Sequence, residues 1–333
     1  MTDSHPLNNL LREMILAVAM IAFLVLGLWA HTGTMPPLVV VESSSMIHEE
    51  NGEVGSIDAG DLILVMDTPY DNIVTFAEAS AKDNNYFGYE THGMAGDVII
   101  YQKNGDAGTP IIHRAILRVE PSQTTSPDRS AGENANNSEH CPNGGTWDSA
   151  VGDVDGEMGT CVLTWSVPGT NVTDSETVTI KFDGYSAGYY DCQRFAHANV
   201  EPYLVVWNWQ PKHSGIVTLG DNNQCSVDQG GLVVNGSSGV HSSSGVAGPV
   251  REAWLVGVAG GEIPWLGTVK LMLSGPSSPG TQYVPSSSFL FLALVIGAII
   301  FAPVGLEAII KKIMQESPEM YQAKLETDYS SEE

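Results

Sequence analysis

The chain has 333 residues, with 39 acidic side chains and 14 lysines or arginines, which gives a formal net charge of −25. So few basic residues argue against a nucleic-acid partner and against a basic patch for anionic lipids, because both need clustered lysine and arginine. The acidic excess favours a hydrated carboxylate surface of the kind found in halophilic proteins, where salt screens the repulsion between like charges, over a polyanionic surface that repels substrates.

The first predicted element is an apolar helix near the N-terminus. Residues 14–30 are uncharged and almost wholly apolar, and the uncharged stretch continues to Val41. About 20 helical residues cross the hydrocarbon core of a bilayer, so we predict a transmembrane helix over residues 14–34. A cleavable signal peptide is the alternative, but Leu28 stands two residues before Ala30 where a small residue is expected.

The middle of the chain is typical of a loop-rich β protein. The 35 glycines and 18 prolines of the chain disfavour long helices, and a short helix is predicted only over residues 74–82. Segments 122–155 and 233–249 are rich in Ser, Gly and Asn and predict surface loops. Nine runs rich in Val, Ile and Leu predict strands: residues 38–41, 62–66, 97–101, 111–119, 178–182, 203–207, 215–219, 254–258 and 266–271.

A second apolar segment lies near the C-terminus. No charged residue occurs between positions 271 and 306, and Lys311 and Lys312 follow closely. We predict a transmembrane helix over residues 286–308, with a buried core helix as the alternative. The positive-inside rule places the following tail in the cytoplasm, and Arg12 points the same way for the N-terminus. The region between the two helices is then extracytoplasmic, in a multi-pass protein of the cell membrane.

The predicted extracytoplasmic region contains all four cysteines and three possible glycosylation sites. No C-x-x-C pair occurs, which argues against a zinc ribbon. Two disulfides in any of three connectivities, or four buried thiols, remain open. Asn136, Asn171 and Asn235 begin N-x-[ST] sequons, which an exterior location makes available for glycosylation. The four cysteines all lie between the apolar segments: Cys141, Cys161, Cys192 and Cys225.

Three separate segments carry residues suited to nucleophilic catalysis. A predicted strand ends in the serines 43–45, where Ser45 can be held still and presented to a substrate. His113 lies in an apolar strand, and a neutral imidazole can take a hydroxyl proton near neutral pH. A Gly-Asp-Asn-Asn run supplies Asp221, and Asp228 follows; either carboxylate can orient a histidine. Taken singly, the segments are more typical of a serine-rich turn, a core histidine and a surface turn.

The order of these segments resembles the type I signal peptidases of the archaeal and endoplasmic-reticulum branch, a family of serine endopeptidases. The resemblance covers residues 10–120 and 215–272, through a membrane helix followed by VVVESSSM, GDLILV, GDVIIY, IIHRAI, GDNN and GEIPWLG. It implies a β-rich catalytic domain that lies against the membrane and cuts secretory signal peptides at its outer face. A histidine in the position of the bacterial lysine indicates the archaeal branch.

The resemblance also implies a role for each matching residue. Ser45, followed by Met46, matches the nucleophile, and His113 matches the general base. Asp221 matches the first acidic residue of the GDNN box and Asp228 the second, although the interval between them is about one residue longer than the family pattern. Which of the two orients the histidine stays open. Ser43 resembles the hydroxyl that shares the oxyanion hole with the Ser45 backbone N–H, and Met46 completes the oxyanion and substrate-binding region.

The resemblance further implies how the chain is organised. The interval between His113 and Asp221 exceeds the family pattern, so the intervening segment is predicted to be an insertion. The Trp- and Pro-containing run 261–267 predicts a surface hairpin at the membrane interface. The predicted divisions are a cytoplasmic N-terminus (1–13), a transmembrane helix (14–34), a first catalytic part (35–121), a β-rich extracytoplasmic insertion (122–210), a second catalytic part (211–285), a transmembrane helix (286–308) and a cytoplasmic acidic tail (309–333).

The implied partners are signal peptides of secretory preproteins and the lipid bilayer. The family's mechanism needs no metal or other cofactor, and no motif identifies a further membrane-protein partner. Two alternatives remain open. One is a membrane-anchored surface binding protein with a catalytically inactive peptidase fold. The other is a peptidase of the same fold that processes only a few dedicated surface proteins.

Overall fold

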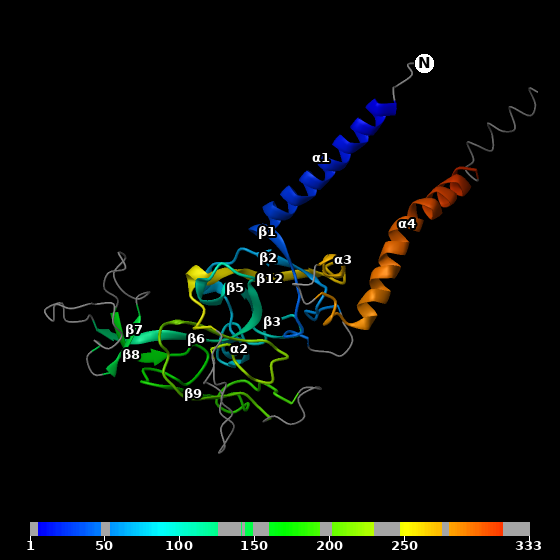
Figure 1. Ribbon diagram of the computed structural model, residues 1–333. Helices are drawn as coiled ribbons and strands as arrows, with labels where there is room; N and C mark the ends of the chain where they lie inside the picture. Colours follow the sequence, from blue (N-terminus) through cyan, green and yellow to red (C-terminus); the bar gives the residue numbers. More distant parts are fainter. Residues whose placement is uncertain are drawn as a thin grey trace, which may run out of the picture. The chain divides into compact units, whose positions relative to one another are not determined.

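The computed structural model describes residues 6–47, 54–125, 141, 144–148, 160–193, 202–229, 247–274 and 280–315 (Figure 1). The chain divides into two compact units, Met1–Pro285 and Ser286–Glu333. An antiparallel β-sheet dominates the first unit, which confirms the predicted mainly β fold class. The sequons at Asn136 and Asn235, and the tail beyond residue 315, lie outside the described residues.

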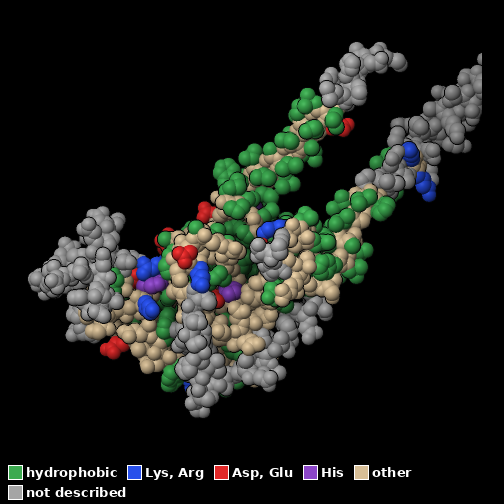
Figure 2. Space-filling view, in the orientation of Figure 1, with side chains coloured by type: hydrophobic (Ala, Val, Ile, Leu, Met, Phe, Trp, Pro, Cys, Tyr) green, Lys and Arg blue, Asp and Glu red, His purple; other side chains and the backbone are tan. Residues whose placement is uncertain are grey.

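The first helix, α1 (Pro6–Thr32), is long and apolar enough to cross a membrane, as the sequence predicts. The most apolar window within Leu10–Thr32 has a mean hydropathy of 2.3, and none of that window is buried. Figure 2 shows hydrophobic side chains along the part of the helix whose side chains are described. Gly33 ends the helix with φ +77°, a left-handed conformation that favours glycine. The chain therefore passes from the apolar helix straight into the first strand.

Eight antiparallel strands form the main sheet, and the long strand β6 extends across it. The first half of β6 pairs with β5 and β11 and its outer half with β8 (Figure 1). Eight of the nine predicted strands coincide or overlap with observed strands. In sheet order the strands are β1 (Gly33–Val40), β2 (Leu62–Met66), β12 (Leu255–Ile263), β5 (Val98–Tyr101), β6 (Ile111–Thr125), β8 (Thr160–Ser166) and β7 (Thr146–Asp148), with β11 (Gly215–Leu219) on β6.

Several short elements surround the sheet. One helix starts at a capping box, in which the Thr75 hydroxyl accepts from the Glu78 amide and the Glu78 carboxylate accepts from the Thr75 amide. This confirms the short helix predicted within residues 74–82. The short elements are α2 (Phe76–Ser80), β3 (Glu90–Thr91), β4 (Met94–Ala95), β9 (Val178–Lys181), β10 (Val205–Trp209), η1 (Tyr70–Asn72), η2 (Lys103–Gly105) and η6 (Glu252–Trp254).

The largest hydrophobic core cluster joins the predicted catalytic parts to the predicted insertion. The Phe76 ring lies edge-on to Phe182 and Tyr190, with centroid distances of 5.7 and 5.0 Å. Trp165 of β8 is fully buried in the same cluster. Aromatic side chains bury large apolar areas, so these contacts stabilise the two segments together. The described part of residues 122–210 thus shares one core with the rest of the first unit.

Both disulfides lie in this first unit. Cys141 pairs with Cys161, and Cys192 pairs with Cys225. The second bridge joins the predicted insertion to the loop that carries the GDNN box. Of the arrangements that the sequence leaves open, the structure thus contains one connectivity with all four thiols paired.

Two sequence predictions at the end of the sheet are wrong. Residues 266–271 were expected to form a strand, but the structure has helix α3 (Thr268–Leu273) there. Residues 261–267 do not form a hairpin, because β12 continues to Ile263 and a turn at Trp265, with φ +62°, leads into α3. A short apolar run fits a strand or a helix by composition, and here the Leu271 amide donates to the Gly267 carbonyl four residues earlier, as in a helix.

The second unit contains one long helix, α4 (Ser286–Gln315). This agrees with a helix over the predicted segment 286–308. Its described apolar stretch, Ser286–Ala302, lies at the lower end of the lengths that cross a bilayer. A second membrane crossing therefore stays a prediction.

Candidate active site

The predicted nucleophile lies in a tight loop that follows β1. The Val41 amide donates to the Asp61 carbonyl at 3.0 Å, which fixes the start of the loop. The Asn222 amide donates to the Ser45 carbonyl, and the Asn222 side chain donates to the Ser44 carbonyl, both at 2.8 Å. The GDNN box therefore holds the serine loop through its backbone carbonyls. Ser45 itself is half-buried in this loop.

Met46 fixes the loop to the hydrophobic core. Its side chain is 1 % exposed and packs in a core cluster with Ile63, Val65 and Ile100. The sequence assigned it to the substrate-binding region, but the structure places it under the serine loop. Ser43 lies on the exposed side, with its Oγ 3.1 Å from the Ser45 Oγ. Of the two predicted neighbours, only Ser43 is thus at the surface beside the nucleophile.

His113 lies between the serine and a carboxylate. Its Nε2 is 3.0 Å from the Ser45 Oγ, and its Nδ1 is 2.5 Å from the Asp228 Oδ2. The ring belongs to β6, where residue 113 pairs with Ile99 of β5, so the sheet fixes its position. An Nδ1–H that donates to the carboxylate leaves Nε2 free to accept the serine proton. This is the order of groups in a serine–histidine–aspartate triad.

Two buried hydroxyls hold the Asp228 carboxylate in place. The Tyr101 hydroxyl donates to Oδ2 at 2.9 Å, and the Thr218 hydroxyl donates to the same oxygen at 2.7 Å. Burial, followed by the nearby Asp228 charge, raises the pKa of Tyr101 well above its usual 10, so it remains a donor. Sequence reasoning missed both residues, because their roles depend on β5 and β11 flanking β6.

The other predicted carboxylate has a different partner. Asp221 accepts from the Arg114 Nε at 3.0 Å and from Nη2 at 2.8 Å, and both side chains are fully buried. The guanidinium also donates to the backbone carbonyls of Met94 and Gly96. Successive side chains on a strand point to opposite faces, so Arg114 and His113 lie on different sides of β6. The structure therefore resolves the choice left open: Asp228, and not Asp221, contacts His113.

The glycine of the GDNN box allows the close approach of its neighbours. A Cβ added at Gly220 would lie 2.7 Å from the His113 Nε2 and 2.8 Å from the Ser45 carbonyl oxygen. A side chain at this position would thus push the histidine away from the serine loop. From the sequence alone, Gly220 was interpreted only as part of a turn, and its contact with His113 was not predicted.

Within the described ranges, no group of three histidine, cysteine or acidic side chains could hold a metal ion. The groups that the structure brings together at the site are a serine hydroxyl, an imidazole and a carboxylate. A hydroxyl beside a histidine that is oriented by a buried carboxylate is suited to nucleophilic attack on a carbonyl carbon.

No protein-family model, curated protein or solved structure matches this chain. The geometry of Ser45, His113 and Asp228, together with the motif order along the chain, therefore indicates the function.

Proposed function

We propose that this protein is a membrane-anchored serine endopeptidase that cleaves N-terminal signal peptides from secreted proteins at the outer face of the membrane. The observation that carries the proposal is the hydrogen-bonded series Ser45–His113–Asp228, with distances of 3.0 and 2.5 Å. The resemblance to the archaeal and endoplasmic-reticulum signal peptidases supplies the substrate class.

The proposed reaction begins with attack by the Ser45 hydroxyl on the carbonyl carbon of the last signal-peptide residue. His113 takes the serine proton on Nε2, and Asp228 stabilises the imidazolium that forms. The oxyanion accepts hydrogen bonds from the Ser43 hydroxyl and the Ser45 backbone N–H. His113 then donates its proton to the leaving amine. Water hydrolyses the acyl-enzyme by the same proton transfers in reverse, which regenerates the free serine.

An apolar surface beside the serine loop supports action at the bilayer. Helix α3 exposes Met272 and Leu273, with 61 and 82 % of their surfaces accessible. Lys270 of the same helix donates to the Glu42 carboxylate at 2.8 Å, three residues before the nucleophile. Contiguous exposed apolar side chains are typical of surfaces that contact a membrane. In the proposal, α3 lies in the outer headgroup region and brings Ser45 close to substrates that are still anchored in the bilayer.

The membrane topology is part of the proposal. Helix α1 crosses the bilayer, residues 286–308 cross it a second time, and both termini are cytoplasmic. The two disulfides support an exterior location of the first unit, because disulfides persist in oxidising compartments. Anchoring the enzyme and its substrate in one membrane raises their effective concentration.

Cleavage of a model preprotein by the detergent-solubilised full chain tests the proposal. The wild type is expected to trim the precursor at the signal junction, while Ser45→Ala and His113→Ala leave it intact. Ser44→Ala is the matched control, because only the backbone carbonyl of Ser44 contacts the GDNN box. The assay is run at low and high salt because of the net charge of −25.

Three results would contradict the proposal. An inert wild type across the salt range would favour the inactive binding protein. A Ser45→Ala variant as active as the wild type would exclude Ser45 as the nucleophile. Cleavage confined to a few surface-protein precursors would favour the dedicated peptidase.

A further inference from the structure

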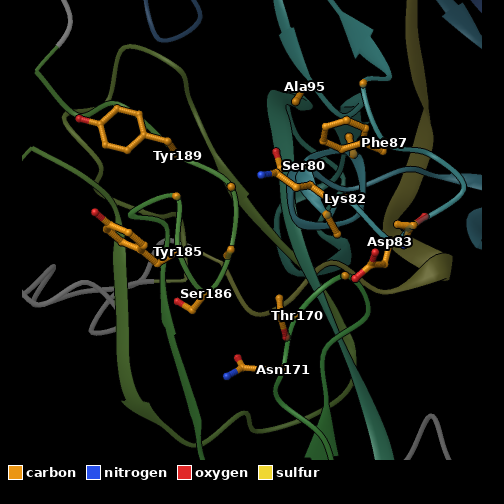
Figure 3. Close-up of a pocket in the computed structure, with 18 of the residues that line it drawn as sticks. Ser80, Lys82, Asp83, Phe87, Ala95, Thr170, Asn171, Tyr185, Ser186 and Tyr189 are labelled. Carbon is orange, nitrogen blue, oxygen red and sulfur yellow. The ribbon is translucent and has the colours of Figure 1, made fainter.

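A cleft separate from the serine site lies between the α2 region and two turns of the middle segment. It has a volume of about 870 Å³, which is within the usual size of a ligand site. Residues 79–84 line one side, and the turns 169–171 and 184–189 line the other (Figure 3). The peptidase mechanism uses none of these residues.

The turn that carries Asn171 is rigidly held. The Val167 amide donates to the Val172 carbonyl at 3.0 Å, and the Thr170 hydroxyl donates to the Val167 carbonyl at 2.8 Å. Gly169, with φ +76°, lies so close to α2 that an added Cβ would be 2.6 Å from the Ala77 carbonyl oxygen. The turn is therefore pressed against the helix, and the Asn171 side chain lies at one end of the cleft (Figure 3).

The same turn presents a complete glycosylation sequon to solvent. Asn171 and Thr173 are both exposed, while Val172 between them is 9 % exposed and packs in the core. The modifying enzyme must reach both the asparagine and the hydroxyl residue of N-x-[ST], and this turn offers both. The disulfide between Cys192 and Cys225 indicates an oxidising exterior, the side on which N-glycans are carried.

Exposed aromatic rings surround the cleft. Tyr185 is 95 % exposed, Tyr189 is 54 % exposed and Phe87 is 55 % exposed. Figure 3 shows these rings on opposite sides of the cleft, with Asn171 at its end. Exposed aromatic rings that gather around one cleft are typical of a ligand-binding groove, and tyrosine adds a hydroxyl that can bind polar groups. A sugar ring has both an apolar C–H face and hydroxyl groups, which matches this lining.

We propose that Asn171 carries an N-linked oligosaccharide whose first sugars lie in the cleft against Tyr185 and Tyr189. The asparagine side-chain nitrogen forms a bond to the anomeric carbon of the first sugar, and the lipid-phosphate carrier of a glycosyl donor leaves with its bonding electrons. The amide proton goes to a base of the transferring enzyme. The inference rests on the exterior location of the first unit and not on peptidase activity.

Peptide mass spectrometry of the full chain, purified from membranes of its native cells, tests the modification. Cleavage after glutamate in the reduced protein gives fragment 158–176, which contains Asn171 and no other sequon. We expect a hexose-containing glycopeptide in the wild type and in Thr173→Ser, which keeps the sequon. Thr173→Ala should give the bare peptide. A bare wild-type peptide would overturn the proposal.

Chemical acetylation of tyrosines tests the placement of the sugar. In Thr173→Ala, Tyr185 should react several-fold faster than in Thr173→Ser, because the cleft is then uncovered. Tyr283, which is 41 % exposed and does not line the cleft, is the internal control and should react equally in both. Equal Tyr185 rates would overturn the placement. Ser45→Ala should carry the same glycan, so a failed peptidase proposal and a failed glycan proposal give different results.

Discussion

On each face of β6 an aspartate pairs with a basic side chain of the strand, but the two pairs have different roles. Asp221 and Asp228 are each 5 % exposed and lie in one loop, yet one pairs with Arg114 and the other with His113. The Arg114–Asp221 pair is buried, and its guanidinium also donates to backbone carbonyls, so the pair is an element of the core. The His113–Asp228 pair lies beside the Ser45 hydroxyl, so it can take part in a reaction. The partner, and not the carboxylate, decides the role.

The largest expected effect comes from breaking the histidine side of this comparison. Asp228→Asn should lower kcat by about 10⁴-fold, because an amide no longer stabilises the imidazolium or fixes the reactive tautomer. The Tyr101 and Thr218 hydroxyls can still donate to the asparagine oxygen, so the melting temperature should change little. Preprotein cleavage and thermal melts of the same samples check this. Activity within tenfold of the wild type would exclude Asp228 as the orienting group.

Breaking the arginine side should mainly affect stability. Asp221→Ala leaves the buried guanidinium of Arg114 without its counter-charge, which costs about 3–5 kcal/mol of unfolding free energy. The double variant Asp221→Leu with Arg114→Met removes both charges but also the donors to the Met94 and Gly96 carbonyls, so it should recover only part of that loss. Denaturant unfolding measures both. Equal losses in the single and double variants would show that the ion pair is not the cause.

The disulfide that holds the shared loop sharpens the comparison. Cys225 lies between the two carboxylates, so replacing Cys192 and Cys225 with serine should cost about 3 kcal/mol and also lower activity. Replacing Cys141 and Cys161 should leave cleavage unchanged, because that bridge joins residues outside the site. Cleavage rates and melting temperatures of the two double variants measure the effect of each bridge on activity and stability. Equal activity in both would mean that the loop keeps its geometry without the bridge.

The smallest effect is expected from one of the hydroxyls behind Asp228. Tyr101→Phe removes one hydrogen bond, and we expect kcat to fall about tenfold, or about 1.4 kcal/mol. Because burial raises the pKa of Tyr101, its hydroxyl stays protonated in neutral and mildly alkaline solution. The factor should therefore be the same at both ends of that range. A loss that appears at only one end, in a pH–rate profile, would contradict this role.

The sequence predicted the parts of the fold that follow from hydrophobic pattern. Helix α1 and eight of the strands arise from long or alternating apolar runs, which are local signals. The run that became α3 is too short for its composition to separate a helix from a strand. The pairing of the cysteines was out of reach for a different reason, since it depends on how residues far apart in the chain meet.

The motif order predicted which residues belong to the candidate site, but it did not predict which of them contact one another. The motif order pointed to Ser45, His113 and both aspartates. The register of β11 on β6 decides which carboxylate reaches the imidazole, and this pairing is irregular between Val217 and Thr218. Likewise, the ion pair between Arg114 and Asp221 is seen only in the folded structure, where both side chains are buried. Such roles depend on long-range contacts that a local motif does not encode.

The most direct test is to trap the acyl-enzyme. Rapid acid quenching of the full chain mixed with a short signal peptide substrate, followed by peptide mass spectrometry, locates the covalent adduct. We expect an ester between the signal-peptide carbonyl and Ser45, and no adduct in Ser45→Ala. An adduct on another residue, or cleavage that persists in Ser45→Ala, would contradict it.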